Sequence, residues 1–392
     1  MRVVKVCIGT WENASRDQRE LGVCKELGAE TIVLAKGNPE DRGREESVNG
    51  FKVLRYTTRP YKHIPVSVNR VISIFQWAKY ASTLDADIIS GHDIGGWTIG
   101  WLSTLFDKTN KPVLVYDSHE FELGRNAKRS KLQIAAIKIW EKKVINSSAF
   151  TIVVNDSIAD ELVKIYKLKE RPVVVRNIPS KWNIDPSVCE AKRKELLNMF
   201  GEGYIVIYHG AICSNRGIEQ LLMAVRDLQG IKLLLVGNPE SEAYLQSLKE
   251  HYLFDMVDKV IVEKAVPHEE LWQYIGAADL CVAPIIPKCR SYYYALPNKF
   301  FEAIQAGTPL LVSDLPEMRR LVEQYRIGET VNSEDICELS EKILLMKNNG
   351  REYYFKGLHE AQTELTWERE KGKLEHAYRK CFNKEKPDTN KQ

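Results

Sequence analysis

The 392-residue sequence predicts an α/β protein of two doubly wound domains, each with a parallel sheet. Three observations predict this fold class. Short apolar runs alternate with amphipathic stretches of helical length, the same alternation restarts in the second half, and a polar segment with prolines, 177–186, separates the two series. We therefore expect a first domain at 1–182 and a second at 187–365.

In the first half, apolar runs of strand length are separated by stretches of helical periodicity. The predicted strands are 3–8, 31–34, 87–89, 112–116, 150–154 and 172–175. The predicted helices are 17–27, 68–82, 131–145 and 157–166. Continuous apolar strands alternating with helices indicate a parallel sheet with helices on both faces.

The second half repeats the pattern. Its predicted strands are 204–209, 232–236, 259–262, 279–283 and 309–313, and its predicted helices are 217–228, 241–251, 268–277, 298–306 and 317–324. A charged final helix, 366–384, follows the second domain. From its order in the chain alone, we expect it to pack back onto the first domain.

Composition excludes several classes of protein. Lys and Arg number 56 against 53 Asp and Glu, so the net charge of +3 argues against a nucleic-acid-binding surface over the whole protein. No apolar run approaches the ~18 residues of a membrane-spanning helix, and the first residues lack a secretory pattern. The eight cysteines contain no C-x-x-C pair, which favours reduced thiols in a cytoplasmic protein over a disulfide framework or a zinc site.

The loop after strand 204–209 is the first candidate site. Ligands of doubly wound sheets bind beyond the carboxyl ends of strands. Here Gly210 and Ala211 allow close approach of the backbone, and Arg216 precedes a predicted helix whose N-terminus also favours an anion. An ordinary turn with a solvated arginine is an equally good interpretation of these residues alone.

The second candidate is the start of helix 298–306. Lys299 and Glu302 are three residues apart, so they project from nearly the same face of the helix. A surface ion pair, worth ~0–1 kcal/mol, is the simpler interpretation. The position of both residues in the first turns, after a strand's carboxyl end, favours a ligand site.

These residues resemble a known family, the retaining glycosyltransferases of family four, which have the GT-B fold. The resemblance covers residues 1–382 and implies two Rossmann-like domains that face each other across a cleft, with a nucleotide diphosphate sugar as donor. It is closer in the second half than in the first. The matching strings are 208–211 with 216–219, 277–284, 296–303 with 307–309, and, in the first half, 115–120, 175–179 and the helix around Trp367.

The resemblance assigns catalytic roles to three residues. Arg216 and Lys299 resemble the cationic pair that holds the donor diphosphate, and His119 resembles the histidine near the donor sugar. Glu302 resembles the glutamate that accepts hydrogen bonds from the ribose hydroxyls.

Other residues are implied to line the donor site. Gly210 and Ala211 would approach the phosphates, and the backbone N–H groups of 292–296, including Tyr294, Ala295 and Leu296, would meet phosphate or sugar. The base would lie near Lys264 and Val266, with nothing to indicate which base it is.

The sequence also departs from the family pattern. Tyr294 stands where the family usually has its first glutamate, and Ala211 stands where an arginine is common. The contacts to the donor sugar are therefore open, and Arg216 must carry more of the phosphate charge.

Two polar pairs of the first half bear on metal and acceptor binding. Asp85 and Asp87 form a D-x-D, but they precede a strand and so lie at its amino end, away from the ligand edge. A simple connector is the better interpretation, and we expect neither a metal ion nor a cofactor. His92 and Asp93 follow the same strand, where they either line the acceptor side or form a solvated loop.

A basic run in the first half suggests contact with a membrane. Lys128, Lys131, Lys138 and Lys142 recur on one helical face, and a second run, 59–80, has four basic and no acidic residues. A solvated helix face is the competing interpretation. We expect a cytoplasmic enzyme, peripheral on an anionic membrane, that acts on a glycan or lipid-linked acceptor in polysaccharide or glycoconjugate assembly.

Three alternatives bear on this function. A nucleotide-sugar epimerase of the same fold would use the same donor site, and a catalytically silent carbohydrate- or partner-binding relative would explain Tyr294. A NAD-dependent dehydrogenase is disfavoured, because no G-x-G-x-x-G follows the first strand.

Overall fold

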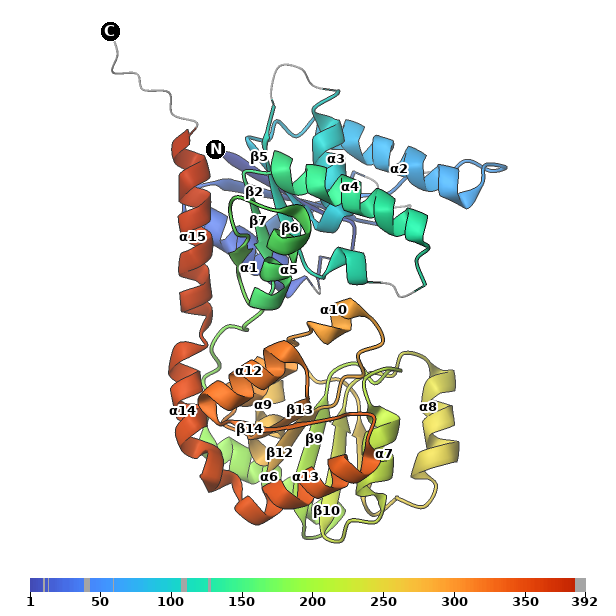
Figure 1. Cartoon of the computed structure of the whole chain (residues 1–392), viewed down its shortest axis with the longest axis vertical. Helices are drawn as coiled ribbons and strands as arrows, with labels where there is room; N and C mark the ends of the chain where they lie inside the picture. The colour runs from blue at the N-terminus through green and yellow to red at the C-terminus, as the bar shows by residue number, and fades with distance from the viewer. Residues whose placement is uncertain are drawn as a thin grey trace. The chain divides into compact units, whose positions relative to one another are not determined.

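The computed structural model describes residues 1–9, 11–12, 14–38, 43–58, 60–106, 111–125 and 128–384. It contains two compact units, Met1–Arg176 together with the segment that begins at Glu370, and Asn177–Arg369 (Figure 1). Each unit is a layered α/β structure on its own sheet, which confirms the predicted fold class. The cleft expected between them stays a prediction.

The first unit is built on a sheet with the strand order β3-β4-β2-β1-β5-β6-β7-β8. All neighbouring strands are parallel except the edge pair β3 and β4. Val4 of β1 aligns with Ile32 of β2 and Ile89 of β5, and all three are buried. The strands are β1 (Arg2–Cys7), β2 (Glu30–Lys36), β3 (Glu45–Val48), β4 (Phe51–Tyr56), β5 (Ile88–His92), β6 (Val113–Ser118), β7 (Phe150–Val153) and β8 (Val173–Val174).

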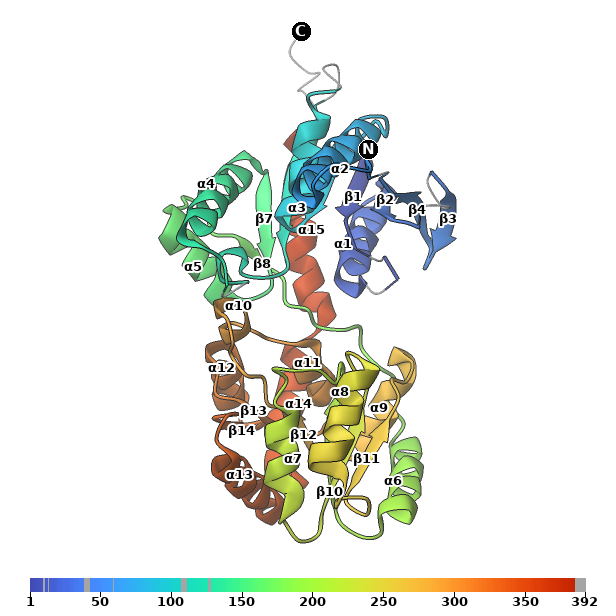
Figure 2. The same cartoon turned by 90° about the vertical axis from the view of Figure 1, so that its right-hand side faces the viewer.

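Helices cover both faces of this sheet (Figure 2). The connection from β1 through α1 to β2 runs in one direction along the sheet, and the connections through α2, α3 and α4 run in the opposite direction. Because such connections are right-handed, α1 lies on one face of the sheet, and α2, α3 and α4 lie on the other. On that second face α3 contacts both α2 and α4. The helices are α1 (Ser15–Glu26), α2 (Val66–Ala81), α3 (Asp93–Ser103), α4 (Lys131–Ser147) and α5 (Asp156–Tyr166).

The sequence patterns missed the β3–β4 hairpin and helix α3. The hairpin turns at Asn49 and Gly50, both with positive φ (52° and 78°), and this dipeptide is a hairpin signal that we did not use. Helix α3 is rich in glycine, which weakens helix propensity. Its glycine has a packing reason, because a Cβ on Gly96 would lie 2.5 Å from the Val6 carbonyl oxygen of β1.

The last helix, α15 (Trp367–Lys384), packs on the first unit. Tyr378 is fully buried, its hydroxyl donates to Glu20 Oε1 at 2.5 Å, and its ring meets Phe150 edge-on with centroids 5.1 Å apart. Lys371 forms an ion pair with Glu26 of α1. The end of the chain thereby completes the core of the unit in which the chain begins.

The second unit is built on a parallel sheet with the order β11-β10-β9-β12-β13-β14. Val206 of β9 aligns with Leu233 of β10 and Leu280 of β12, and all three are fully buried. The strands are β9 (Tyr204–His209), β10 (Ile231–Val236), β11 (Val260–Glu263), β12 (Leu280–Ala283), β13 (Leu310–Ser313) and β14 (Gly328–Val331).

The helices of the second unit form two layers. On one face α7 packs against α13, and on the other α9 packs against α6 and α11. Our patterns did not predict α6, α10, α13, α14 or β14. The helices are α6 (Pro186–Phe200), α7 (Ile218–Arg226), α8 (Glu242–Leu248), α9 (His268–Ala277), α10 (Arg290–Tyr293), α11 (Asn298–Gln305), α12 (Pro316–Tyr325), α13 (Ile336–Asn349) and α14 (Phe355–Glu364).

Candidate active site

Each sheet has a point at which the direction of its crossovers reverses, between β1 and β5 in the first unit and between β9 and β12 in the second. Ligands of doubly wound sheets bind beyond the carboxyl ends of the strands at such a point. The predicted catalytic and acceptor-side residues fall into two clusters, one near each of these places.

In the second unit, Arg216 is held by an unusual turn. Its neighbours Asn215 and Gly217 both have positive φ, 64° and 71°. A Cβ at position 217 would lie 2.0 Å from the Pro284 carbonyl oxygen, so only glycine fits there. The turn leads into α7, which begins at Ile218, two residues after Arg216. The guanidinium lies over the ring of Tyr292, 5.2 Å from its centroid.

Lys299, at the second position of α11, lies at the same end of the sheet. Its side chain is buried, and its Nζ lies 3.5 Å from the centroid of the Tyr208 ring. Within the described ranges this Nζ has no hydrogen-bond partner. A Cβ on Gly210, which has φ of 106°, would lie 3.6 Å from the same Nζ, so the glycine leaves open space beside the ammonium.

The two cations affect each other electrostatically. Burial, reinforced by the charge of Arg216, lowers the pKa of Lys299 to about 7. Tyrosine rings support both cations, and in the described part of the chain neither cation forms an ion pair with a carboxylate. The site is therefore short of negative charge, which an anionic ligand would supply.

Glu302, one turn after Lys299, is almost fully buried and accepts hydrogen bonds from two imidazoles. His209 Nε2 lies 2.8 Å from its Oε2, and His268 Nε2 lies 3.2 Å from its Oε1. Burial alone would raise the pKa of Glu302, but these two contacts lower it to about 2. The two histidines differ in exposure. His209 is buried, which lowers its pKa, and the His268 side chain is 54% exposed.

The other residues predicted to bind the donor are Ala211, Lys264 and Val266, which lie in the loops after β9 and β11. Ala211 is exposed beside Gly210, and its carbonyl oxygen accepts from the Tyr208 hydroxyl at 2.7 Å. Lys264 and Val266 lie in the loop after β11, where Lys264 is exposed and Val266 packs against the core.

The segment 292–296 is helical only at its start, because α10 ends at Tyr293 and a turn follows at Tyr294. The N–H groups of Tyr294 and Ala295 already donate to the carbonyl oxygens of Arg290 and Tyr292, at 3.2 and 3.0 Å. These two N–H groups are therefore occupied within the protein, and contact of the 292–296 backbone with phosphate or sugar stays a prediction. Tyr294 and Leu296 are buried, and the Tyr294 hydroxyl accepts from Arg290 at 3.1 Å.

In the first unit the structure brings together His119, His92 and Asp93. The two imidazole rings are 3.8 Å apart, and the His119 backbone N–H donates to Asp93 Oδ1 at 2.9 Å. The other oxygen of Asp93 accepts from Arg125 at 2.9 Å. The sequence left open whether His92 and Asp93 form a solvated loop; both are packed within this cluster.

Beneath the histidines lies an ionic network that sequence reasoning missed. Lys5 of β1 is fully buried among three carboxylates, with its Nζ 2.9 Å from Asp17 Oδ1 and 2.8 Å from Asp117 Oδ2 and in contact with Glu20. Arg16 binds Asp117 from another side. Lys5 stands inside the apolar run of the first strand, and this position was the sequence signal for a buried ionic network.

The network fixes the ionisation of its members. Burial alone would lower the pKa of Lys5, but Asp117, Asp17 and Glu20 raise it well above its ordinary value. The same opposition acts on His119, where Asp117 and Asp17 outweigh burial and raise its pKa. Asp17 likewise raises the pKa of His92 to about 10.

Two groups in this network have the spacing of metal ligands, Cys7, Asp17 and His92, and Asp17, Asp117 and His119. Their two carboxylates, Asp17 and Asp117, already face Lys5, and Asp117 also faces Arg16. Asp85 and Asp87 lie elsewhere, at the amino ends of β1 and β5, where Asp87 Oδ2 accepts from the Arg2 backbone N–H.

The basic residues predicted to face a membrane are all exposed on or just before α4: Lys128, Lys131, Lys138 and Lys142. Leu132 and Ile139 beside them are 84% and 73% exposed. Trp140 instead packs inward, edge-on against Trp101 at 5.4 Å. Arg59, in the second basic run, lies outside the described residues. No helix in the described ranges is long and apolar enough to cross a membrane.

Comparison with protein families matches both halves of the chain. Residues 23–178 match the model described as Glycosyltransferase Family 4, and residues 203–349 match the model described as Glycosyl transferases group 1. Comparison with curated proteins gives no match.

Solved structures share the fold at low sequence identity. Sucrose-phosphate synthase from Thermosynechococcus elongatus is similar with a TM-score of 0.75 and 18% identity, covering 98% of this chain and 100% of that one. Anabaena HepE in complex with UDP-glucose has a TM-score of 0.72 and 13% identity, covering 97% and 100%. The catalytic domain of Arabidopsis thaliana starch synthase IV, bound to ADP and acarbose, has a TM-score of 0.69 and 12% identity, covering 98% and 99%.

The two α/β units and these neighbours define the fold as GT-B. The two matching family models make the protein a glycosyltransferase with this fold. More particularly, it belongs to the group 1 and family 4 glycosyltransferases, whose models match its second and first halves.

Proposed function

We propose that this enzyme transfers a glycosyl group from a nucleoside diphosphate sugar to a hydroxyl of a glycan or lipid-linked acceptor, with retention of anomeric configuration. One observation carries the proposal. Arg216 and the buried Lys299 stand at the ligand edge of the second sheet on tyrosine rings, with no carboxylate bound to either in the described structure. A diphosphate supplies the missing negative charge.

In the proposed reaction the bond between the anomeric carbon and the diphosphate oxygen breaks as the acceptor oxygen bonds to that carbon, and the proton of the acceptor hydroxyl passes to the departing diphosphate oxygen. Negative charge then develops on the leaving diphosphate. Lys299 and Arg216 would stabilise this charge without rearrangement, because Tyr208, the 215–217 turn and burial already fix them. Glu302, ionised because its pKa is about 2, would accept hydrogen bonds from the ribose hydroxyls.

His119 would act as a positive, oriented group of the donor-sugar site and not as a base. Its Nε2 lies 2.8 Å from Asp117 and 3.2 Å from Asp17, contacts that hold the proton on the ring. No metal ion takes part in the proposed reaction, since Arg216 and Lys299 provide the positive charge at the diphosphate and Lys5 already faces the first unit's acidic residues.

The structural neighbours support a nucleotide donor. HepE was solved with UDP-glucose and starch synthase IV with ADP, both on folds that align with nearly the whole chain. We propose the same class of donor here. The departures at Tyr294 and Ala211 leave the identity of the sugar open.

We further propose that the enzyme works at the cytoplasmic face of an anionic membrane, in the assembly of a polysaccharide or glycoconjugate. Lys131, Lys138 and Lys142 are exposed along α4, together with Leu132 and Ile139. Each basic residue near an anionic surface contributes about 1 kcal/mol.

Flotation with phosphatidylglycerol vesicles at low salt tests this proposal and should retain the protein. Replacement of the three lysines by glutamate should release it, whereas Lys194→Glu in the second unit should not.

Thermal unfolding with UDP-, GDP- and ADP-linked sugars tests the donor class. A ligand present at 100 times its Kd stabilises the folded protein by about 2.7 kcal/mol, so one nucleotide should raise the unfolding temperature clearly. Arg216→Ala should abolish that rise. No response to any of these nucleotides would refute the proposal. Epimerised nucleotide sugar formed without acceptor would instead identify an epimerase.

A further inference from the structure

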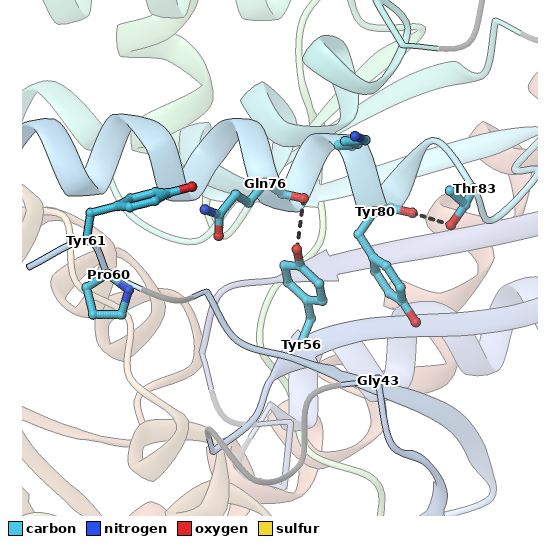
Figure 3. Close-up of a pocket in the computed structure, with 8 residues that line it drawn as sticks. Gly43, Tyr56, Pro60, Tyr61, Gln76, Tyr80 and Thr83 are labelled. Carbon is cyan, nitrogen blue, oxygen red and sulfur yellow. Dashed lines mark hydrogen bonds between the residues drawn. The ribbon is translucent and has the colours of Figure 1, made fainter.

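The first unit contains a groove that no step of the proposed reaction uses. It lies between α2 and the end of β4, encloses about 990 Å³, and is drawn in Figure 3. Besides Gly43 and Pro60, it is lined by three tyrosines and three other polar residues, namely Tyr56, Tyr61, Tyr80, Gln76, Lys79 and Thr83. None of them belongs to the cluster around His119.

An aromatic pair forms one part of the groove. Tyr56 and Tyr80 stack with centroids 4.6 Å apart and planes at 15°. Tyr56 is fixed further, because its hydroxyl donates to the Gln76 carbonyl oxygen at 3.1 Å and Trp77 meets its ring edge-on at 5.3 Å. Tyr56, itself buried, therefore supports the half-buried ring of Tyr80 from behind.

Tyr61 stands at the other end of the labelled residues in Figure 3. Its side chain is 55% exposed, yet its backbone is clamped to α2 through Asn69. The Tyr61 N–H donates to Asn69 Oδ1 at 2.9 Å, and Asn69 Nδ2 donates back to the Tyr61 carbonyl oxygen at 3.0 Å. An exposed aromatic ring on a clamped backbone is prepared for contact before a ligand arrives.

Gln76 lies between Tyr61 and the stacked pair, as Figure 3 shows. Its Oε1 is buried, and no donor in the described structure reaches it. A buried acceptor without a donor destabilises a fold, so the fold gives no reason for a glutamine here. Gln76 is also one of the residues that line the groove.

We propose that this groove binds an oligosaccharide segment of the acceptor, as a subsite separate from the transfer site. Tyrosine rings offer flat apolar faces to the C–H faces of sugar rings, while the Gln76 amide, the Lys79 ammonium and the Thr83 hydroxyl offer partners to sugar hydroxyls. An acyl chain would leave these polar groups unpaired. The inference rests on the proposed transfer to a glycan.

The test measures binding of the full chain to an array of defined oligosaccharides of hexoses, hexosamines and uronic acids. Gln76→Leu should weaken the bound glycan by roughly twofold to tenfold, the size of one lost hydrogen bond. Tyr61→Ala should weaken it by a similar factor. Gln76→Leu should also unfold at the same or a higher temperature than the unaltered chain, because it removes an unpartnered buried acceptor. Tyr353→Ala, an exposed tyrosine of the second unit, is the matched control and should change neither property.

The outcomes separate this proposal from the proposed function. Absence of any glycan binding, or glycan binding unchanged in both groove variants, overturns the groove, as does a loss confined to binding of phosphatidylglycerol vesicles. The nucleotide-induced thermal shift should be the same in all four proteins. Its absence from the unaltered chain would refute the donor proposal while leaving the glycan measurement valid.

Discussion

Two buried lysines, one in each unit, have opposite electrostatic environments. Lys5, on the first strand of the first sheet, contacts Asp17, Glu20 and Asp117, which raise its pKa well above the ordinary value. Lys299 lies over the Tyr208 ring near Arg216, and burial with Arg216 lowers its pKa to about 7. One lysine completes a charge-balanced core, and the other leaves a positive site that a ligand must balance.

The difference shows how one architecture can position two kinds of site. In the first unit the charges are satisfied within the protein, so they hold His119 and His92 in place. In the second unit the charges are not balanced locally, which destabilises the empty site and favours an anion. Removal of each lysine should therefore affect different properties.

The largest effect is expected for Lys5→Met. Removing the cation leaves three buried carboxylates without their main partner, and breaking a buried ion pair in this way costs about 3–5 kcal/mol. Denaturant unfolding followed by circular dichroism should show this loss. Lys299→Met is the matched control, because it removes a buried cation without a carboxylate partner and should leave stability unchanged or raised. Equal losses in the two variants would contradict the contrast between the units.

Activity should show the reverse order of importance. Lys299→Met and Arg216→Ala should each lower kcat by about 10²–10³, the effect of losing ~2–4 kcal/mol of stabilisation at the leaving group. Steady-state release of nucleotide from the donor measures this loss, and an unfolding temperature no lower than that of the unaltered enzyme is the folding control. Turnover close to that of the unaltered enzyme in either variant would remove that residue from the diphosphate site.

The contrast also explains what the sequence could predict. Arg216, Lys299 and Glu302 could be picked out from the sequence because they lie at fixed offsets from strand ends and helix starts. The hydrogen bonds from His209 and His268 to the two Glu302 oxygens could not be predicted from the sequence, because the three residues come from three separate elements.

The ionic network of the first unit could not be predicted either, because its residues also come from separate elements. Asp17, Glu20 and Asp117 meet Lys5 only through tertiary packing, and α15 brings Tyr378 to Glu20 from the far end of the chain. Local periodicity found most strands but missed α3, whose glycine pattern reflects close approach to β1 and not intrinsic helix propensity.

The pH dependence of donor binding sharpens the contrast further. The free enzyme loses the Lys299 proton as pH rises through about 7, whereas the bound diphosphate favours the charged form and raises this pKa. Above pH 7, affinity for an intact nucleoside diphosphate sugar should therefore fall, by up to about tenfold per pH unit. Calorimetry in two buffers at pH 8 should detect proton uptake on binding. Lys299→Arg stays charged at this pH, so its binding should take up no proton and should vary little with pH.

The smallest expected effect concerns His268, which holds the Glu302 oxygen that a ribose hydroxyl would need. Its Nε2 lies 3.2 Å from Glu302 Oε1, and Trp182 packs on its ring with centroids 5.1 Å apart. If ribose must replace this contact, His268→Ala should tighten nucleoside diphosphate binding by about twofold to tenfold. A 2′,3′-dideoxy nucleotide lacks both hydroxyls and is the control, because its affinity should not change. Weaker binding of the normal nucleotide by His268→Ala would show that His268 contributes to the bound site, and that the second unit is more complete before ligand binding than its unpaired cations indicate.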